Sequence, residues 1–162
     1  MRLSAIAIRW GRLFGPRCVR GRCYMSGLCD SAHFVRQWVE KAEDDLKVST
    51  YLLTMGHECP YSAVCFHAQQ CVEKYIKALL VYYGIDFPKI HDLTKLTRLV
   101  PAEMLIPLSD EEQDKLTDYA TVDRYPGDRE PITDAEAEEA VSIARRVREA
   151  IRSFLPPEVL TH

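Results

Sequence analysis

Residues 61–83 read YSAVCFHAQQCVEKYIKALLVYY, and this stretch decides the fold. At 3.6 residues per turn, one side of it is apolar, formed by Tyr61, Cys65, Ala68, Val72, Ile76, Leu79 and Tyr83. A separate face is polar and carries His67, Gln70, Glu73, Lys74 and Lys77. Gly84 follows, the residue type that most readily ends a helix in a left-handed conformation. The stretch therefore predicts one long amphipathic helix that packs by its apolar side.

The rest of the chain predicts further helices and no strand. A first helix over 31–55 is indicated by inward residues at helical spacing, namely Phe34, Trp38, Ala42, Leu46, Ser49 and Leu53. We expect three more helices over 91–99, 109–121 and 133–155, the last two opened by capping boxes at Ser109–Glu112 and Thr133–Glu136. The short loop at 57–60 predicts antiparallel packing of the first two helices. The predicted fold is all-α, an antiparallel up-and-down bundle of about five helices.

Charge divides the chain of 162 residues into two parts. Residues 1–29 contain six Arg and no acid, which leaves 15 basic and 24 acidic residues in 30–162, a net formal charge of −9. We interpret residues 1–30 as a disordered basic tail, or as the product of a start codon assigned too early, with Met25 the true start; an organelle transit peptide shares the Arg-rich bias. Residues 31–162 form the predicted domain. Such an acidic domain needs a local basic cluster to bind nucleic acid.

Cysteine spacing argues against metal and against disulfides. Cys59, Cys65 and Cys71 recur every six residues, without the closely spaced pairs typical of structural zinc. We expect free thiols in a reducing cytoplasm, no metal and no cofactor. No apolar run approaches the roughly 20 residues of a membrane span, so we expect no membrane association.

Four segments together resemble one known family. The run Phe66-His67-Ala68-Gln69-Gln70, followed by Glu73-Lys74 and Lys77-Ala78-Leu79-Leu80, is similar to the second helix of the HEPN domain (higher eukaryotes and prokaryotes nucleotide-binding). Residues 38–46 resemble its first helix, 88–93 the start of its third, and 123–126 the segment before its last long helix. The resemblance covers 31–155.

The resemblance implies several functions. It implies a homodimer that binds a nucleotide or RNA, or that serves as the partner subunit of a minimal nucleotidyltransferase in a toxin–antitoxin-like pair. A degenerate HEPN ribonuclease toxin is one alternative, and a non-catalytic helical dimerisation module is another. A strip of small residues on the central helix, Ala63, Cys71 and Ala78, would let a second helix approach closely, or would be a second contact with the core.

The catalytic motif of the family's ribonucleases is absent. That motif is an Arg and a His separated by four to six residues, and no Arg stands at this spacing before any of the His residues, 33, 57, 67, 91 and 162. The variant with Tyr in place of His is absent after Arg124 as well. We therefore assign no catalytic residue, and the sequence favours a protein that is not an enzyme.

Arg124 and Tyr125 are the first candidates for ligand binding. They stand in the polar loop DRYPGDREP, residues 123–131, between two predicted helices. Arg offers a planar fork for phosphate, and Tyr offers a face on which a base can stack. The structural alternative is a loop held by ion pairs from Arg124 to Asp123 or Asp128.

Lys89, His91 and Asp92 are the second group of candidates. A cation near the start of a helix is a natural phosphate site, and Lys89 precedes the predicted third helix. The structural alternative is that Asp92 or His91 caps this helix. For His67 we expect a structural role, with a hydrogen bond to the first helix or to a loop.

Overall fold

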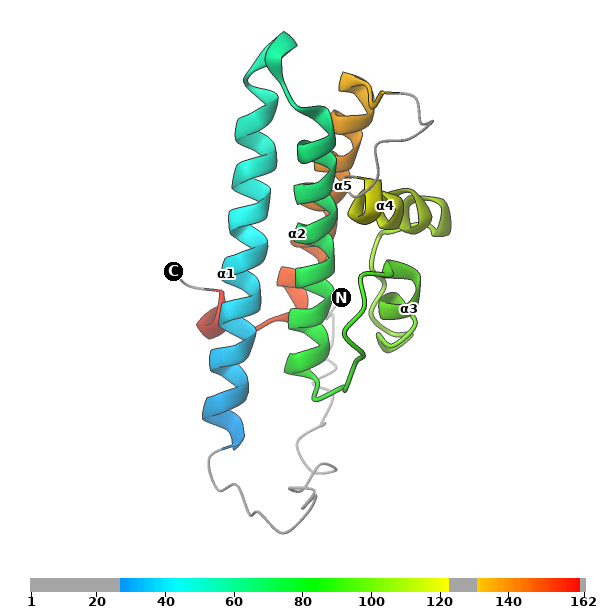
Figure 1. The fold of residues 1–162 in the computed structure, drawn as a ribbon. Helices are drawn as coiled ribbons and strands as arrows, with labels where there is room; N and C mark the ends of the chain where they lie inside the picture. Colours follow the sequence, from blue (N-terminus) through cyan, green and yellow to red (C-terminus); the bar gives the residue numbers. More distant parts are fainter. Residues whose placement is uncertain (1–26, 123–130, 161–162) are drawn as a thin grey trace, which may run out of the picture.

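The computed structural model describes residues 27–122 and 131–160, which contain helices and no strand (Figure 1). In chain order the elements are α1 (Gly27–Leu53), η1 (Gly56–Glu58), α2 (Tyr61–Tyr82), α3 (Leu93–Thr97), α4 (Asp110–Val122), α5 (Asp134–Phe154) and η2 (Pro157–Val159). The all-α prediction is confirmed, with five α-helices in the described part of the chain. Residues 1–26, which hold most of the basic N-terminal segment, lie outside the described residues.

Helix α2 is the centre of the bundle. It packs against α1, α5, α4 and α3, and 13 of its 22 residues are buried. Its largest core side chains, Tyr75, Ile76, Leu79 and Leu80, are fully shielded from solvent. The helix ends at Gly84, whose φ of +66° is a conformation that only glycine adopts without strain. Residues 61–83 therefore do organise the fold, but they pack on more sides than one apolar stripe suggests.

The three long helices lie side by side, and the two short ones flank them. Helices α1 and α2 run antiparallel, joined by the turn at η1, and α5 packs against both (Figure 1). Helices α3 and α4 lie on the other side of α2, where α4 runs across α2 rather than along it (Figure 1). The third helix is shorter than the predicted 91–99, because Asp92 caps it and the chain turns away before Pro101.

Both predicted capping boxes are present. The Ser109 backbone N–H donates to Glu112 Oε2 at 2.9 Å, and the Glu112 N–H donates to Ser109 Oγ at 3.2 Å. Thr133 and Glu136 make the same reciprocal pair at the start of α5. Each pair satisfies backbone donors that the first turn of a helix leaves without a partner.

The buried face of α1 differs from the predicted one. Phe34, expected to point inward, is 53% exposed, whereas the neighbouring Val35 and Val39 are fully buried. Ala42 and Ser49 are buried as expected. The inward stripe is therefore rotated around the helix, because its position depends on where α2 and α5 lie.

Glu43, a charged residue of α1, is also buried. Its Oε1 accepts hydrogen bonds from the Tyr75 hydroxyl of α2 and, at 2.7 and 3.1 Å, from Arg148 Nε and Arg152 Nη1 of α5. Burial raises the pKa of the Glu43 carboxyl, but the hydrogen bonds of Arg148 and Tyr75 and the charges of both arginines outweigh burial and hold that pKa below 4.5. One carboxylate thus ties three helices together.

A second ion cluster joins α1 to α2. Asp45 bonds to His67 Nδ1 at 2.9 Å through one oxygen and to the Lys74 ammonium through the other. The expected structural hydrogen bond from His67 to the first helix is therefore confirmed.

Two of the three residues of the small-residue strip on α2 face the core. Cys71 and Ala78 are fully buried against this chain's own helices, so this part of the strip is a core contact, whereas Ala63 is only partly buried. Cys59, Cys65 and Cys71 are buried free thiols, as expected. No helix in the described ranges combines the length and hydropathy needed to cross a bilayer.

Candidate functional site

A stripe of polar side chains on α2 lies buried against the segment that leads to α3. Gln69, Glu73 and Lys77 follow one another at four-residue intervals, so they share one line along the helix. Their exposed fractions are 0, 2 and 5%. Buried charges are stable only when they are paired and hydrogen-bonded, so these three residues must be held by partners.

Those partners come from one another and from the backbone of residues 90 and 91. Lys77 Nζ donates to Glu73 Oε1 at 2.7 Å and to the Ile90 carbonyl at 3.0 Å. Gln69 Nε2 donates to Glu73 Oε2 at 3.0 Å and to the His91 carbonyl at 3.4 Å. The stripe therefore fixes the backbone that precedes α3.

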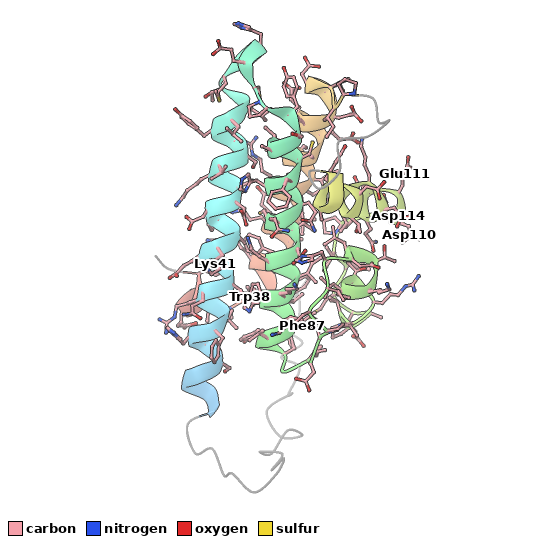
Figure 2. All side chains as sticks on the ribbon, viewed as in Figure 1. Trp38, Lys41, Phe87, Asp110, Glu111 and Asp114 are labelled. Carbon is pink, nitrogen blue, oxygen red and sulfur yellow. The ribbon has the colours of Figure 1, made fainter. Side chains whose placement is uncertain are left out.

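Two aromatic rings enclose the Lys77 ammonium. Its nitrogen lies 5.6 Å from the Trp38 ring centroid and 5.8 Å from that of Phe87. The two rings meet nearly edge to face at 6.4 Å, and Figure 2 labels both. Ring faces attract a cation, and this attraction replaces part of the hydration that Lys77 loses on burial.

His91 is the solvent-exposed end of this polar network. Its Nδ1 lies 3.1 and 3.2 Å from the two Glu73 oxygens, while 59% of its side chain is exposed. A carboxylate oxygen can only accept a hydrogen bond. The Nδ1–H of His91 is therefore the donor in this hydrogen bond to Glu73. More than half of the imidazole is therefore open to solvent, while buried Glu73 fixes the orientation of the ring.

Asp92 caps α3, as one of the predicted alternatives requires. Its Oδ1 accepts from the Lys95 backbone N–H at 2.9 Å, and its Oδ2 lies 2.8 Å from Lys95 Nζ. The hydrogen bonds from Lys95 hold the pKa of the Asp92 carboxyl below its usual value. This cap sets the direction in which the chain leaves His91.

A surface pocket continues from this point between α3 and α4. Asp92, Lys95 and Arg98 line one side, and Asp114 and Thr117 line the other. Figure 2 labels Asp114 on α4. Thr117 Oγ1 accepts from the backbone N–H of the first α3 residue at 3.1 Å, which holds the two helices together.

The structure brings some of the sequence candidates together and leaves others outside its description. His91 and Asp92 are adjacent and anchored, and Lys89 is exposed without a hydrogen bond or ion pair to the described residues. Arg124 and Tyr125 lie outside the described residues.

Sequence reasoning missed the burial of Glu73 and Lys77, which it placed on a polar outer face, and did not single out Gln69. The four-residue spacing of these residues shows that they share one side of the helix. The same spacing is found in ion pairs on exposed helix surfaces, so it does not show that the side chains are buried. Over the described parts of the chain, no cluster of three or more His, Cys, Asp or Glu is arranged to hold a metal ion.

These features define an all-α bundle whose central helix carries a buried polar stripe that anchors a His-Asp turn. The family model of the HEPN domain matches residues 35–154, and the chain belongs to this family.

Relatives of known sequence or structure agree with this assignment. The chain is 33% identical over 138 residues to "Putative toxin MJ1304" of Methanocaldococcus jannaschii, a match that covers 75% of this chain and 88% of that protein. The crystal structure of TT1696 from Thermus thermophilus is similar with a TM-score of 0.62 at 26% identity, covering 75% of this chain and 98% of the other. ST0689, described as an archaeal HEPN homologue, is similar with a TM-score of 0.57 at 28% identity, covering 74% and 96%.

Proposed function

We propose that this chain is the HEPN subunit of a toxin-type pair, a homodimer that binds a nucleotide or RNA and takes a small nucleotidyltransferase as its partner. The observation that carries the proposal is the similarity to "Putative toxin MJ1304", because the match spans 88% of that protein rather than a fragment of it. The buried free thiols of the described cysteines suit the reducing cytoplasm in which such a pair would act.

The proposed ligand-binding residues are Lys89, His91 and Asp92, together with Arg124 and Tyr125, which lie outside the described residues. Lys89 offers an exposed cation, and His91 offers an imidazole whose orientation is set by buried Glu73. Asp92 acts by holding the turn, since its carboxylate is occupied by Lys95. Arg124 would contribute a fork for phosphate and Tyr125 a stacking face for a base.

A focused site is required because the domain as a whole repels anions. Residues 30–162 carry a net formal charge of −9, so diffuse attraction cannot hold a phosphate-bearing ligand. Affinity must then depend on a few short contacts, each of which contributes about 1.5–3 kcal/mol when one partner is charged. This dependence makes the site testable by single substitutions.

The first experiment measures binding and stability on the same proteins. Fluorescence anisotropy with a labelled single-stranded RNA and a labelled ATP analogue should show roughly ten-fold or greater weakening for Arg124→Ala and Lys89→Ala, at an unchanged melting temperature. Arg124→Lys should recover only part of the loss, because an ammonium is not a bidentate fork. The matched control is Lys47→Ala on α1, whose exposed pair with Asp44 spans 3.7 Å. An unchanged affinity with a lowered melting temperature for Arg124→Ala would refute the site.

The second experiment tests the partner. Native mass spectrometry of the purified protein, alone and after co-expression with a small nucleotidyltransferase, should show the homodimer and then a mixed complex. Failure of the two proteins to associate would refute the partner while leaving ligand binding open to the first experiment.

A further inference from the structure

The outer face of α1 carries exposed hydrophobic side chains among its charged ones. Seven large hydrophobic side chains are exposed in the described part of the chain, and four of them belong to α1 or follow its end. These are Phe34 at 53%, Val48 at 39%, Tyr51 at 72% and Met55 at 42% exposure. Single exposed apolar residues are ordinary, but an aligned group marks a surface that meets a partner.

Three of the four residues lie along one side of the helix. Within α1, Phe34, Lys41 and Val48 are spaced by seven residues, and Tyr51 follows Val48 by three residues on the same side; Met55 follows the end of the helix. With Gln37 and Asp44 between them, they form what we call the α1 outer stripe. Val35, Val39 and Ala42, which face the core, lie on the opposite side of the helix. Seven-residue spacing of this kind is typical of the contact line between two paired helices.

We propose that the α1 outer stripe is the surface on which a second copy of this chain docks, with the two α1 helices antiparallel about a two-fold axis. The proposal rests on the homodimer of the proposed function. It states which face of each copy forms the contact and how the two α1 helices are aligned. In an isologous pair, each contact occurs twice, from either copy to the other.

The charges on the stripe select the antiparallel register. When the axis passes midway between Lys41 and Asp44, Lys41 of each copy lies across from Asp44 of the other. The same register sets Phe34 across from Tyr51 at both ends of the contact. A parallel, in-register pair would instead oppose Lys41 to Lys41 and Asp44 to Asp44, which is unfavourable.

Both charges are available for such contacts. Lys41 has no ion pair or hydrogen bond with the residues that the structure describes, and it stands exposed on α1, where Figure 2 labels it. Asp44 has only the distant Lys47, at 3.7 Å, with both side chains more than 70% exposed. Pairing with a second copy therefore breaks no strong contact within the chain.

Charge reversal on the full-length protein tests the register. Lys41→Glu and Asp44→Lys each oppose like charges twice, and each should weaken the dimer about ten-fold in sedimentation equilibrium at low salt. An equimolar mixture of the two variants should associate about as tightly as the wild type, because every crossing pair is then again of opposite sign. Glu149→Lys, an exposed acid on α5, is the matched control and should leave the dimer unchanged. Tyr51→Ser should weaken the dimer at any salt concentration, since it removes apolar contact.

Three results would overturn the proposal. One is a wild-type protein that stays monomeric at high micromolar concentration. Another is a dimer that none of the stripe variants affects, which would leave the homodimer of the proposed function standing but on another face. The third is weakening by the single variants without recovery in the mixture. Nucleotide and RNA affinity measured on the same variants separates this surface from the ligand site, because no residue of the stripe belongs to the site.

Discussion

Replacing Glu43 with Gln is the sharpest test of what holds the bundle together. The substitution keeps the size of the side chain and one carbonyl oxygen, but it removes the charge that faces Arg148 and Arg152. The Arg148 bond to the carboxylate is 2.7 Å long and the Arg152 bond 3.1 Å, and the carboxyl side chain is only 11% exposed. Helix α1 would then lose its charged tie to α5.

The size of the effect follows from these contacts. Removing one partner of a buried ion pair costs about 3–5 kcal/mol, because the remaining charge is left uncompensated. The two arginines are 29 and 27% exposed, so water recovers part of that loss. We therefore expect a fall of about 2–3 kcal/mol in the free energy of unfolding. For a domain of this size, that fall lowers the melting temperature by roughly 5–10 °C.

The assay is thermal and urea denaturation followed by circular dichroism, with Glu40→Gln as control because Glu40 is exposed on the same helix. The pH dependence gives a second reading. The Glu43 pKa is lowered on folding, so its contribution is present above the unfolded value of about 4.5 and is lost as pH falls through the folded value. The stability difference between wild type and Glu43→Gln should therefore shrink below that pH. A loss no greater than that of Glu40→Gln would refute the reasoning.

Three further predictions concern single sites. Cys65 and Cys71 should resist a disulfide reagent in the native protein at mildly alkaline pH and react on unfolding, because burial raises the pKa of Cys65 to about 11 and that of Cys71 further; fast native labelling would contradict this. Thr133→Ala should cost about 1 kcal/mol in urea denaturation by removing the α5 cap, and an unchanged midpoint would argue against the capping box. Gly84→Ala should lower the free energy of unfolding by about 1 kcal/mol, because an alanine is strained at a φ of +66°. The added methyl meets no atom within 4 Å, so backbone strain is the cause, and equal melting temperatures of variant and wild type would contradict it.

The features that the sequence by itself determined are those that depend on local interactions. The helices, the two capping boxes and the ends of α2 depend on residues only three or four apart, so their pattern is readable without the fold. Asp92 as a cap belongs to the same class, since its partner is Lys95. The family resemblance drew on the same local runs, and the match to the HEPN domain over residues 35–154 confirmed it.

The position of the candidate site depended on contacts between distant segments. The sequence named His91 and Asp92 as candidates, but it could not show that Glu73 and Lys77 are buried beneath them, because these partners are 13 to 18 residues away. The ligand roles of Lys89, Arg124 and Tyr125 stay predictions.

Tertiary packing also decided which face of each helix is buried. Glu43 lies inside because Arg148 and Arg152, more than 100 residues later, arrive beside it on α5. Phe34 is exposed and Val35 is buried because the positions of the neighbouring helices determine which side of α1 is covered. Helical periodicity shows that a helix has two faces. Which polar groups can be buried depends on whether the fold brings them a partner, because an unpaired buried charge is too costly to keep.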